Sequence, residues 1–79
     1  MHKRSLTIHG HRTSISLEEP FWMALNDIAK ARQQSVASLV QMIDKKRVGG
    51  LSSAIRVFIL AELRHQLAAS TTTKTNQIF

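Results

Sequence analysis

Three polar side chains at every second position, Arg12, Ser14 and Ser16, are the residues of this sequence best suited to chemistry. Side chains that alternate in this way share one face of a β-strand. A guanidinium group donates several hydrogen bonds in a fixed fork, and a hydroxyl group both donates and accepts. The chemistry that this row offers is therefore recognition through hydrogen bonds rather than the making of covalent bonds.

Patterns on which catalysis commonly depends are absent from the sequence. It has no glycine-rich phosphate loop, no Ser-His-Asp or Cys-His arrangement at a supporting spacing, and no cluster of carboxylates. Cysteine is absent, and His9 and His11 have no neighbouring Asp, Glu or Cys that would complete a metal site. We therefore expect no catalytic residue, no metal and no cofactor, and hence no enzyme.

The charge of the chain points to a polyanionic partner. Eleven Lys and Arg residues stand against five Asp and Glu residues, which gives a net charge of +6 and a pI of about 11.0. A pI above about 9 is typical of nucleic-acid-binding domains. No window approaches the roughly 18 apolar residues of a membrane span, and no apolar segment follows the basic start. We expect a cytoplasmic protein that makes no membrane contact.

The elements that position the polar row begin with a strand over residues 12–17, whose other face carries Ile15 and Leu17. A strand needs a partner for its backbone groups, and no second strand follows. A core of 79 residues is also small enough that association would stabilise it. We therefore expect the same strand of a second copy to pair with it, antiparallel and related by a two-fold axis.

Residues 1–11 leave two alternatives open. They begin with a basic cluster that includes Lys3 and Arg4, and then alternate with Leu6 and Ile8 on the opposite parity from the main strand. Gly10 stands where the parity changes, which suggests a bulge or a turn. The segment is either a flexible basic arm, in which Lys3 and Arg4 follow phosphates, or a strand that pairs beside the first.

Three helices should follow the strand. The first begins near Pro20, which suits a first helical position. The second runs from about Val36 to Lys45, and Ser35 is placed to cap it. The third begins at Ser52 or Ser53 and is apolar around nearly its whole circumference, which implies that a second chain covers it.

Apolar spacing on these elements predicts the core of a dimer. Residues 69–79 show no period and many small polar side chains, so we expect a disordered tail there. The side chains expected in the dimer core are Ile15, Leu17, Phe21, Trp22, Leu25, Leu39, Ile43 and Phe58.

The order of these pieces resembles the ribbon-helix-helix family of Arc and MetJ repressors. The resemblance implies a mainly α fold, a dimer with one short intermolecular antiparallel β-strand pair and three helices per chain. Together with the composition of the two ends, this gives a basic N-terminal arm over residues 1–11, a domain over 12–68 and a tail over 69–79. The general pattern lies in the runs Arg12–Glu19, Ile28–Ala29 and Gln34–Leu39 with Phe21 and Leu25, and the runs Gly10–Trp22 and Leu51–Phe58 resemble a bacterial subfamily with a third helix.

The resemblance also implies a function. It suggests a homodimeric transcriptional regulator, such as a repressor, that inserts its ribbon into the major groove of double-stranded DNA and that could assemble further there. By position, Arg12, Ser14 and Ser16 would contact base edges, with Arg12 the best reader of guanine because serine discriminates bases poorly. Ser35 and the amides of Val36 and Ala37 would hold a phosphate.

Two further alternatives remain open. The chain could instead be a protein-interaction module, such as the antitoxin of a toxin-antitoxin pair, that binds a partner protein through the third helix or the tail. In addition, Ser52 and Ser53 also resemble the start of the family's second helix. We favour the helix that Ser35 caps, because the short turn before it matches the family spacing.

Overall fold

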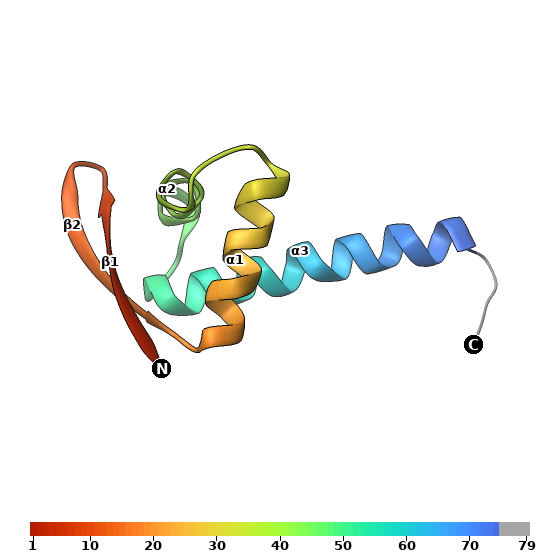
Figure 1. Ribbon diagram of the computed structural model, residues 1–79, viewed down its shortest axis with the longest axis horizontal. Helices are drawn as coiled ribbons and strands as arrows, with labels where there is room; N and C mark the ends of the chain where they lie inside the picture. The colour runs from red at the N-terminus through yellow and green to blue at the C-terminus, as the bar shows by residue number, and fades with distance from the viewer. Residues whose placement is uncertain (75–79) are drawn as a thin grey trace.

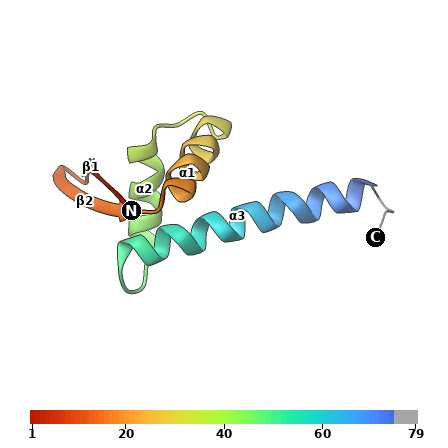
Figure 2. The same ribbon diagram turned by 60° about the horizontal axis from the view of Figure 1, so that its bottom comes forward.

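The computed structural model describes residues 1–74 of the chain, and the side chains of residues 1–69. Two strands, β1 (His2–Ile8) and β2 (His11–Leu17), are followed by three helices, α1 (Glu19–Ala31), α2 (Val36–Lys46) and α3 (Leu51–Lys74). The strands form a hairpin on one side of α1 and α2, and α3 extends well beyond the other elements (Figures 1 and 2). The prediction of three helices and an antiparallel strand pair is confirmed.

The strand pair lies within one chain. β1 and β2 are antiparallel, with a register that runs from His2 opposite Leu17 to Ile8 opposite His11. One edge of β2 therefore has a partner within its own chain, and the pairing of its other edge with a second copy stays a prediction. The hairpin also decides between the alternatives for residues 1–11, since residues 2–8 form a strand rather than a flexible arm.

A two-residue turn sets this register. His9 and Gly10 both have positive φ, 52° and 81°, as the turns of tight β-hairpins require. With two residues in the turn, even positions of β1 share a face with odd positions of β2. The change of parity around Gly10 is therefore the signature of a hairpin.

The helices begin for local reasons. Pro20 stands in the first turn of α1 beside the acidic Glu19, which suits the positive end of the helix dipole. The Ser38 backbone N–H donates a hydrogen bond of 3.0 Å to Ser35 Oγ, so Ser35 is the N-cap of α2 as predicted. α3 begins at Leu51, so Ser52 lies just inside its first turn.

One hydrophobic core joins both strands and all three helices. The inner face of the hairpin packs on the apolar stripes of α1 and α2, and the first turns of α3 complete the contact. The buried side chains are Ile8, Ile15, Leu17, Trp22, Leu25, Ile28, Ala29, Leu39, Val40, Ile43, Ile55 and Ile59.

The side chains expected in a dimer core are therefore largely covered by their own chain. Ile15, Leu17, Trp22, Leu25, Leu39 and Ile43 are buried, and Phe21 and Phe58 are half-buried against them. The alternation of β2 and the helical spacing of α1 and α2 identified the inward faces. These faces meet within one chain because β1 and α3 close over them.

α3 is only partly covered by its own chain. Among its residues 51–69, Ile55 and Ile59 are buried, whereas four apolar side chains on one side, which we call the α3 stripe, are exposed. The helix also continues to Lys74, so residues 69–74, expected in a disordered tail, are helical. Residues 75–79 of the expected tail lie outside the described residues. The α3 stripe consists of Val57, Leu60, Leu63 and Leu67, which are 67%, 58%, 44% and 68% exposed.

Within residues 1–74, the helices are all too short or too polar to cross a membrane.

The core can be tested with a matched pair of valines. Val40 is fully buried, whereas Val48 is 96% exposed. Val40→Ala should lower the free energy of unfolding by about 2 kcal/mol, because two buried methyl groups at about 0.8 kcal/mol each are lost and a small cavity remains. Val48→Ala should change it by less than about 0.5 kcal/mol. Urea denaturation measures both, and equal losses would contradict this packing.

The turn can be tested with a matched pair of glycines. A Cβ atom would meet no neighbour at either Gly10 or Gly50, but only Gly10 of these two has a positive φ. Gly10→Ala should therefore destabilise the protein by about 1–2 kcal/mol through backbone strain. Gly50→Ala should cost clearly less in the same thermal denaturation experiment. If Gly10→Ala destabilises the protein less than Gly50→Ala does, Gly10 does not have the positive φ described here.

Candidate nucleic-acid interface

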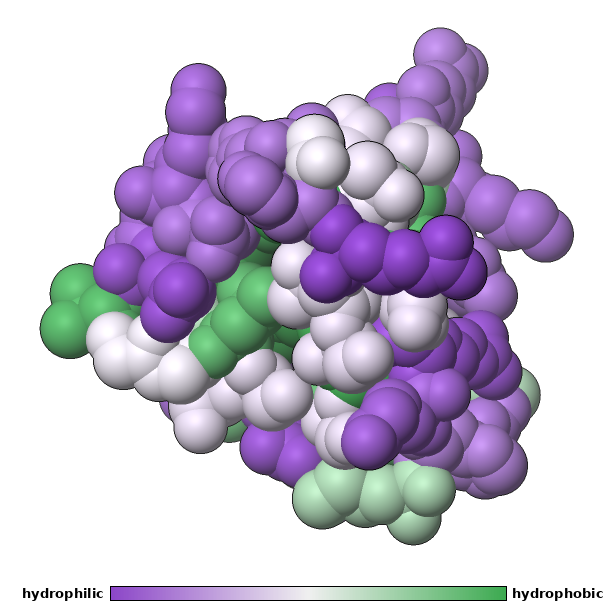
Figure 3. All heavy atoms as spheres, turned by 90° about the vertical axis from the view of Figure 1, so that its left-hand side faces the viewer, coloured by the Kyte–Doolittle hydropathy of each residue, from purple (hydrophilic) through white to green (hydrophobic). Residues whose placement is uncertain are grey.

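The hairpin turns one polar face outward. Residues opposite each other on paired strands point to the same side, and the register places Lys3 opposite Ser16, Ser5 opposite Ser14 and Thr7 opposite Arg12. We call these six residues the outer face. All of them are exposed except Ser16, which is half-buried. Seen from this side, the molecule is mainly hydrophilic or near neutral in hydropathy (Figure 3).

The structure brings the three predicted base-contacting residues together. Arg12, Ser14 and Ser16 follow one another along the outer face, while Ile15 and Leu17 between and after them are buried. Sequence reasoning missed Ser5 and Thr7, which stand across from this row on β1. The change of apolar parity at Gly10, interpreted as a two-residue turn, would have identified them.

Arg12 differs from most other arginines in forming no ion pair with any residue that the structure describes. Within the part of the chain that the structure describes, neither Arg12 nor Lys3 forms an ion pair. Four arginines instead contact carboxylates, Arg4 with Glu19 at 3.8 Å, Arg32 with Glu62 at 3.0 Å, Arg47 with Asp44 at 2.5 Å and Arg56 with Glu18 at 2.9 Å. The two cations of the outer face are therefore available to an anionic partner.

Arg4 does not join Lys3 on the outer face. Its guanidinium carbon lies 5.0 Å from the centre of the Trp22 ring, and its Nη2 lies 3.8 Å from Glu19 Oε1. A cation over an aromatic ring contributes about 0.5–1 kcal/mol at an exposed site. Arg4 thus fastens β1 to the start of α1. The sequence had grouped Lys3 with Arg4, but alternation along the strand separates them.

Three hydrogen bonds hold the hairpin against the helices. They engage the turn, the start of β1 and the end of β2, and each comes from or goes to a different helix. These contacts hold both strands in fixed positions, so the six residues of the outer face form one surface. The His9 backbone N–H donates to Gln41 Oε1 at 3.0 Å, Trp22 Nε1 donates to the His2 carbonyl at 2.9 Å, and Ser52 Oγ donates to the Ser16 carbonyl at 3.2 Å.

The junction between β2 and α1 is held by a charged pair. Arg56 of α3 donates to Glu18 Oε1 from Nε, at 3.0 Å, and its Nη2 lies 2.9 Å from the same oxygen. A hydrogen bond from the backbone of Glu18 and the Arg56 guanidinium lower the pKa of the Glu18 carboxyl. The carboxylate therefore stays charged and ties the end of the ribbon to α3.

The start of α2 offers backbone donors. The N–H groups of a helix's first turn have no carbonyl partner within the helix, and they attract anions. Val36 and Ala37 occupy this turn and are half-buried, while the Ser35 cap is exposed. Ser52, the competing candidate, uses its hydroxyl to hold the hairpin. Ser35 therefore caps the start of α2, whereas the Ser52 hydroxyl contacts the hairpin.

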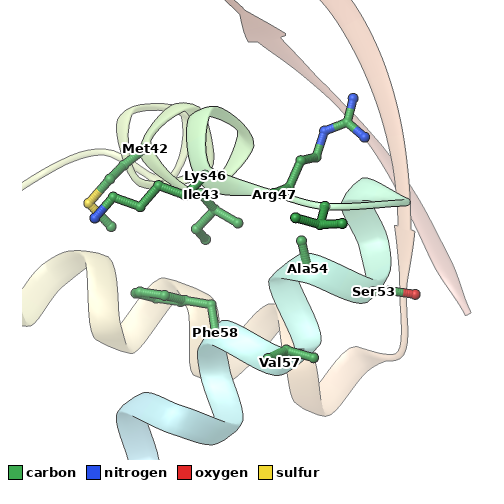
Figure 4. Close-up of a pocket in the computed structure, with 9 residues that line it drawn as sticks. Met42, Ile43, Lys46, Arg47, Ser53, Ala54, Val57 and Phe58 are labelled. Atoms are coloured by element: carbon green, nitrogen blue, oxygen red, sulfur yellow. The ribbon is translucent and has the colours of Figure 1, made fainter.

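An open hollow of about 340 Å³ lies between the end of α2 and the start of α3 (Figure 4). No carboxylate and no histidine lines it, so it offers contact rather than acid–base chemistry. In the described part of the chain, no group of three or more His, Cys, Asp or Glu residues could hold a metal ion. The lining consists of Met42, Ile43, Lys46, Arg47, Val48, Ser53, Ala54, Val57 and Phe58.

Comparison with known families agrees with this architecture. A family model described as "Ribbon-helix-helix domain" matches residues 1–63, which include the hairpin, α1, α2 and the first half of α3. Comparison with curated proteins and with solved structures finds no match. Ribbon-helix-helix domains are in general DNA-binding regulators or antitoxins, and they form dimers. The polar ribbon, the helices behind it and the match over residues 1–63 together show that this chain belongs to the ribbon-helix-helix family.

Proposed function

We propose that this protein is a homodimeric transcriptional regulator that binds double-stranded DNA in a sequence-specific way. The outer face of the hairpin enters the major groove, where Arg12, Ser14 and Ser16 of each chain contact bases. The observation that carries this proposal is the exposed Arg12, which stands on a two-stranded ribbon with no ion-pair partner among the described residues. The major groove, about 12 Å wide, admits such a ribbon.

Contacts to phosphate hold the ribbon in register. Lys3 stands at the end of the outer face farthest from the turn, opposite Ser16, where it reaches toward the backbone of a duplex. The amides of Val36 and Ala37, with the Ser35 hydroxyl, bind a second phosphate. We leave Arg4 out of this set because Trp22 and Glu19 already engage it.

The α3 stripe supports the homodimer. Four apolar side chains on one helix side, 44% to 68% exposed in a single chain, are an unusual surface to leave in water. A second copy covers this surface, so the dimer presents Arg12, Ser14 and Ser16 twice and carries twice the charge of +6. On tandem DNA sites, such dimers bind side by side. Because the protein binds DNA, it is associated with the nucleoid.

Arg12 should determine part of the sequence preference. After a binding selection from randomised duplexes at near-physiological salt, Arg12→Ala should weaken binding to the selected duplex by about 1–3 kcal/mol and flatten the preference at one base pair per half-site. Arg64→Ala removes the same charge from an exposed position of α3 and should affect preference little. Equal losses by Arg12→Ala on selected and random duplexes would reject base contact.

Ser35 should behave differently. Ser35→Ala removes a cap and a phosphate contact, so it should weaken binding to all duplexes alike while costing about 1 kcal/mol of stability. Ser53→Ala, at an exposed position in the first turn of α3, is the matched control and should leave binding unchanged. Titrations of each variant against selected and scrambled duplexes measure the effect, and a loss confined to the selected duplex would refute a phosphate role.

A second candidate function rests on the same α3 stripe. In an antitoxin, this surface would hold a partner protein instead of a second copy. Two experiments distinguish the homodimeric regulator from the antitoxin. They are sedimentation of the purified chain at micromolar concentration and purification of the protein from its native host. A dimer that Leu60→Asp dissociates supports the regulator, whereas a folded monomer that co-purifies with one protein partner supports the antitoxin.

A further inference from the structure

We propose that the hollow between the end of α2 and the start of α3 binds a small amphipathic anion, a molecule with an apolar body and one carboxylate group. The hollow has a volume of about 340 Å³. Small-molecule sites usually have volumes of roughly 300–1,000 Å³, and they often lie between packed helices. This inference concerns a site on the helices and does not depend on the proposed binding of DNA.

The walls of the hollow are mainly apolar, and they come from two helices. Met42 and Ile43 of α2 lie on one side, and Val57 and Phe58 of α3 lie on the other (Figure 4). Ile43 is buried, Phe58 is half-buried and Val57 is 67% exposed, so the hollow extends from the core to the surface. An apolar ligand body that covers the exposed part of these walls removes apolar surface from water, which favours binding.

Arg32 connects the two walls. Its Nη1 donates to the Met42 sulfur at 3.8 Å, and its guanidinium carbon lies 5.3 Å from the centre of the Phe58 ring. Its Nη2 lies 3.0 Å from Glu62 Oε1, so a carboxylate of the same chain already engages this cation. The walls are therefore held in place before a ligand arrives, and a site formed in advance loses less entropy on binding.

Lys46 supplies the charge that selects an anion. It is exposed and lines the hollow, and within the described part of the chain it forms no ion pair. The other lining cation, Arg47, contacts Asp44 Oδ1 at 2.5 Å and also donates to the Gly49 carbonyl. Because no carboxylate lines the hollow, an anionic group that reaches Lys46 is attracted without a competing negative charge.

Charge also favours a small anion over a second copy as the occupant of the hollow. The hollow and the α3 stripe share one residue, Val57, and the other three residues of the stripe do not line the hollow. A second copy on the stripe therefore borders the hollow at Val57. To fill the hollow, a chain with a net charge of +6 would have to approach Lys46, and like charges repel.

The test compares decanoate, 1-decanol and decylammonium, which share an alkyl chain, each below the concentration at which it aggregates. Isothermal titration calorimetry should show one decanoate site per chain, weaker binding of 1-decanol and the weakest binding of decylammonium. Lys46→Gln should weaken decanoate binding about fivefold and leave 1-decanol binding unchanged. Lys45→Gln is the matched control and should leave both unchanged, because Lys45 stands in the same last turn of α2 but does not line the hollow.

Two methionines report where decanoate binds. Met42 lines the hollow, whereas Met23 of α1 is 59% exposed and does not line it. In NMR spectra of protein labelled at the methionine methyl groups, decanoate should shift the Met42 signal and leave the Met23 signal in place. Val57→Asp puts a negative charge in the hollow and should abolish decanoate binding. Leu67→Asp, at an equally exposed position of the α3 stripe outside the hollow, should preserve it, and circular dichroism checks that both variants are folded.

Several results would overturn the proposal. If decanoate binds no better than decylammonium, or if Lys46→Gln binds decanoate as the wild type does, the hollow does not select an anion. If the Met23 and Met42 signals shift together, decanoate coats exposed apolar surface as a detergent does. If Leu67→Asp abolishes decanoate binding and also dissociates a dimer, the compound binds between two copies instead. None of these results depends on whether the protein binds DNA.

Discussion

The pairing of β1 with β2 is the constraint on which the rest of the structure depends. A strand must satisfy its backbone hydrogen-bonding groups, and this chain satisfies one edge of β2 with its own N-terminal residues. The two-residue turn at His9 and Gly10 fixes the register of that pair. Since the register decides which side chains share a face, it creates the buried inner face and the polar outer face together.

Packing of the inner face turns this hairpin into a rigid element. An isolated two-stranded hairpin is marginally stable in water, but Ile8, Ile15 and Leu17 are buried against the helices. Hydrogen bonds to Gln41, Trp22 and Ser52 add fixed points at its ends. The positions of the polar side chains on the outer face are consequently set by the packing of the apolar side chains on the opposite face.

The distribution of charge follows the same division. Among the described residues, four of the five arginines off the outer face pair with carboxylates, as Arg56 does with Glu18 and Arg32 with Glu62. Cations on the outer face have no such neighbours among the described residues. Ion pairs within the chain thus neutralise most of its few acidic groups. The unpaired positive charges include those on the outer face, which a polyanion would approach. α3 has two roles. Its first turns contact the end of the hairpin, and its later turns expose the α3 stripe.

Periodicity along the chain determined much of this fold. Alternation over residues 12–17 gave the inward and outward faces of β2, and the spacing of apolar residues gave the stripes of α1 and α2. Capping by Ser35 and the placing of Pro20 located two helix starts, because these signals act within one turn of the chain. The resemblance to the ribbon-helix-helix family rested on the same local order.

Tertiary structure alone decided what these faces meet. The sequence assigned the partner of β2 to a second copy because no strand follows it, whereas in the structure one edge of β2 pairs with the strand that precedes it. Likewise, an apolar circumference predicted that α3 needs cover from a second chain, but only the structure shows which part its own chain covers, since Ile55 and Ile59 are buried and Leu60 is exposed. The apolar pattern identifies which side of a helix or strand will be buried. Which residues bury that side depends on how the elements pack together in one small core.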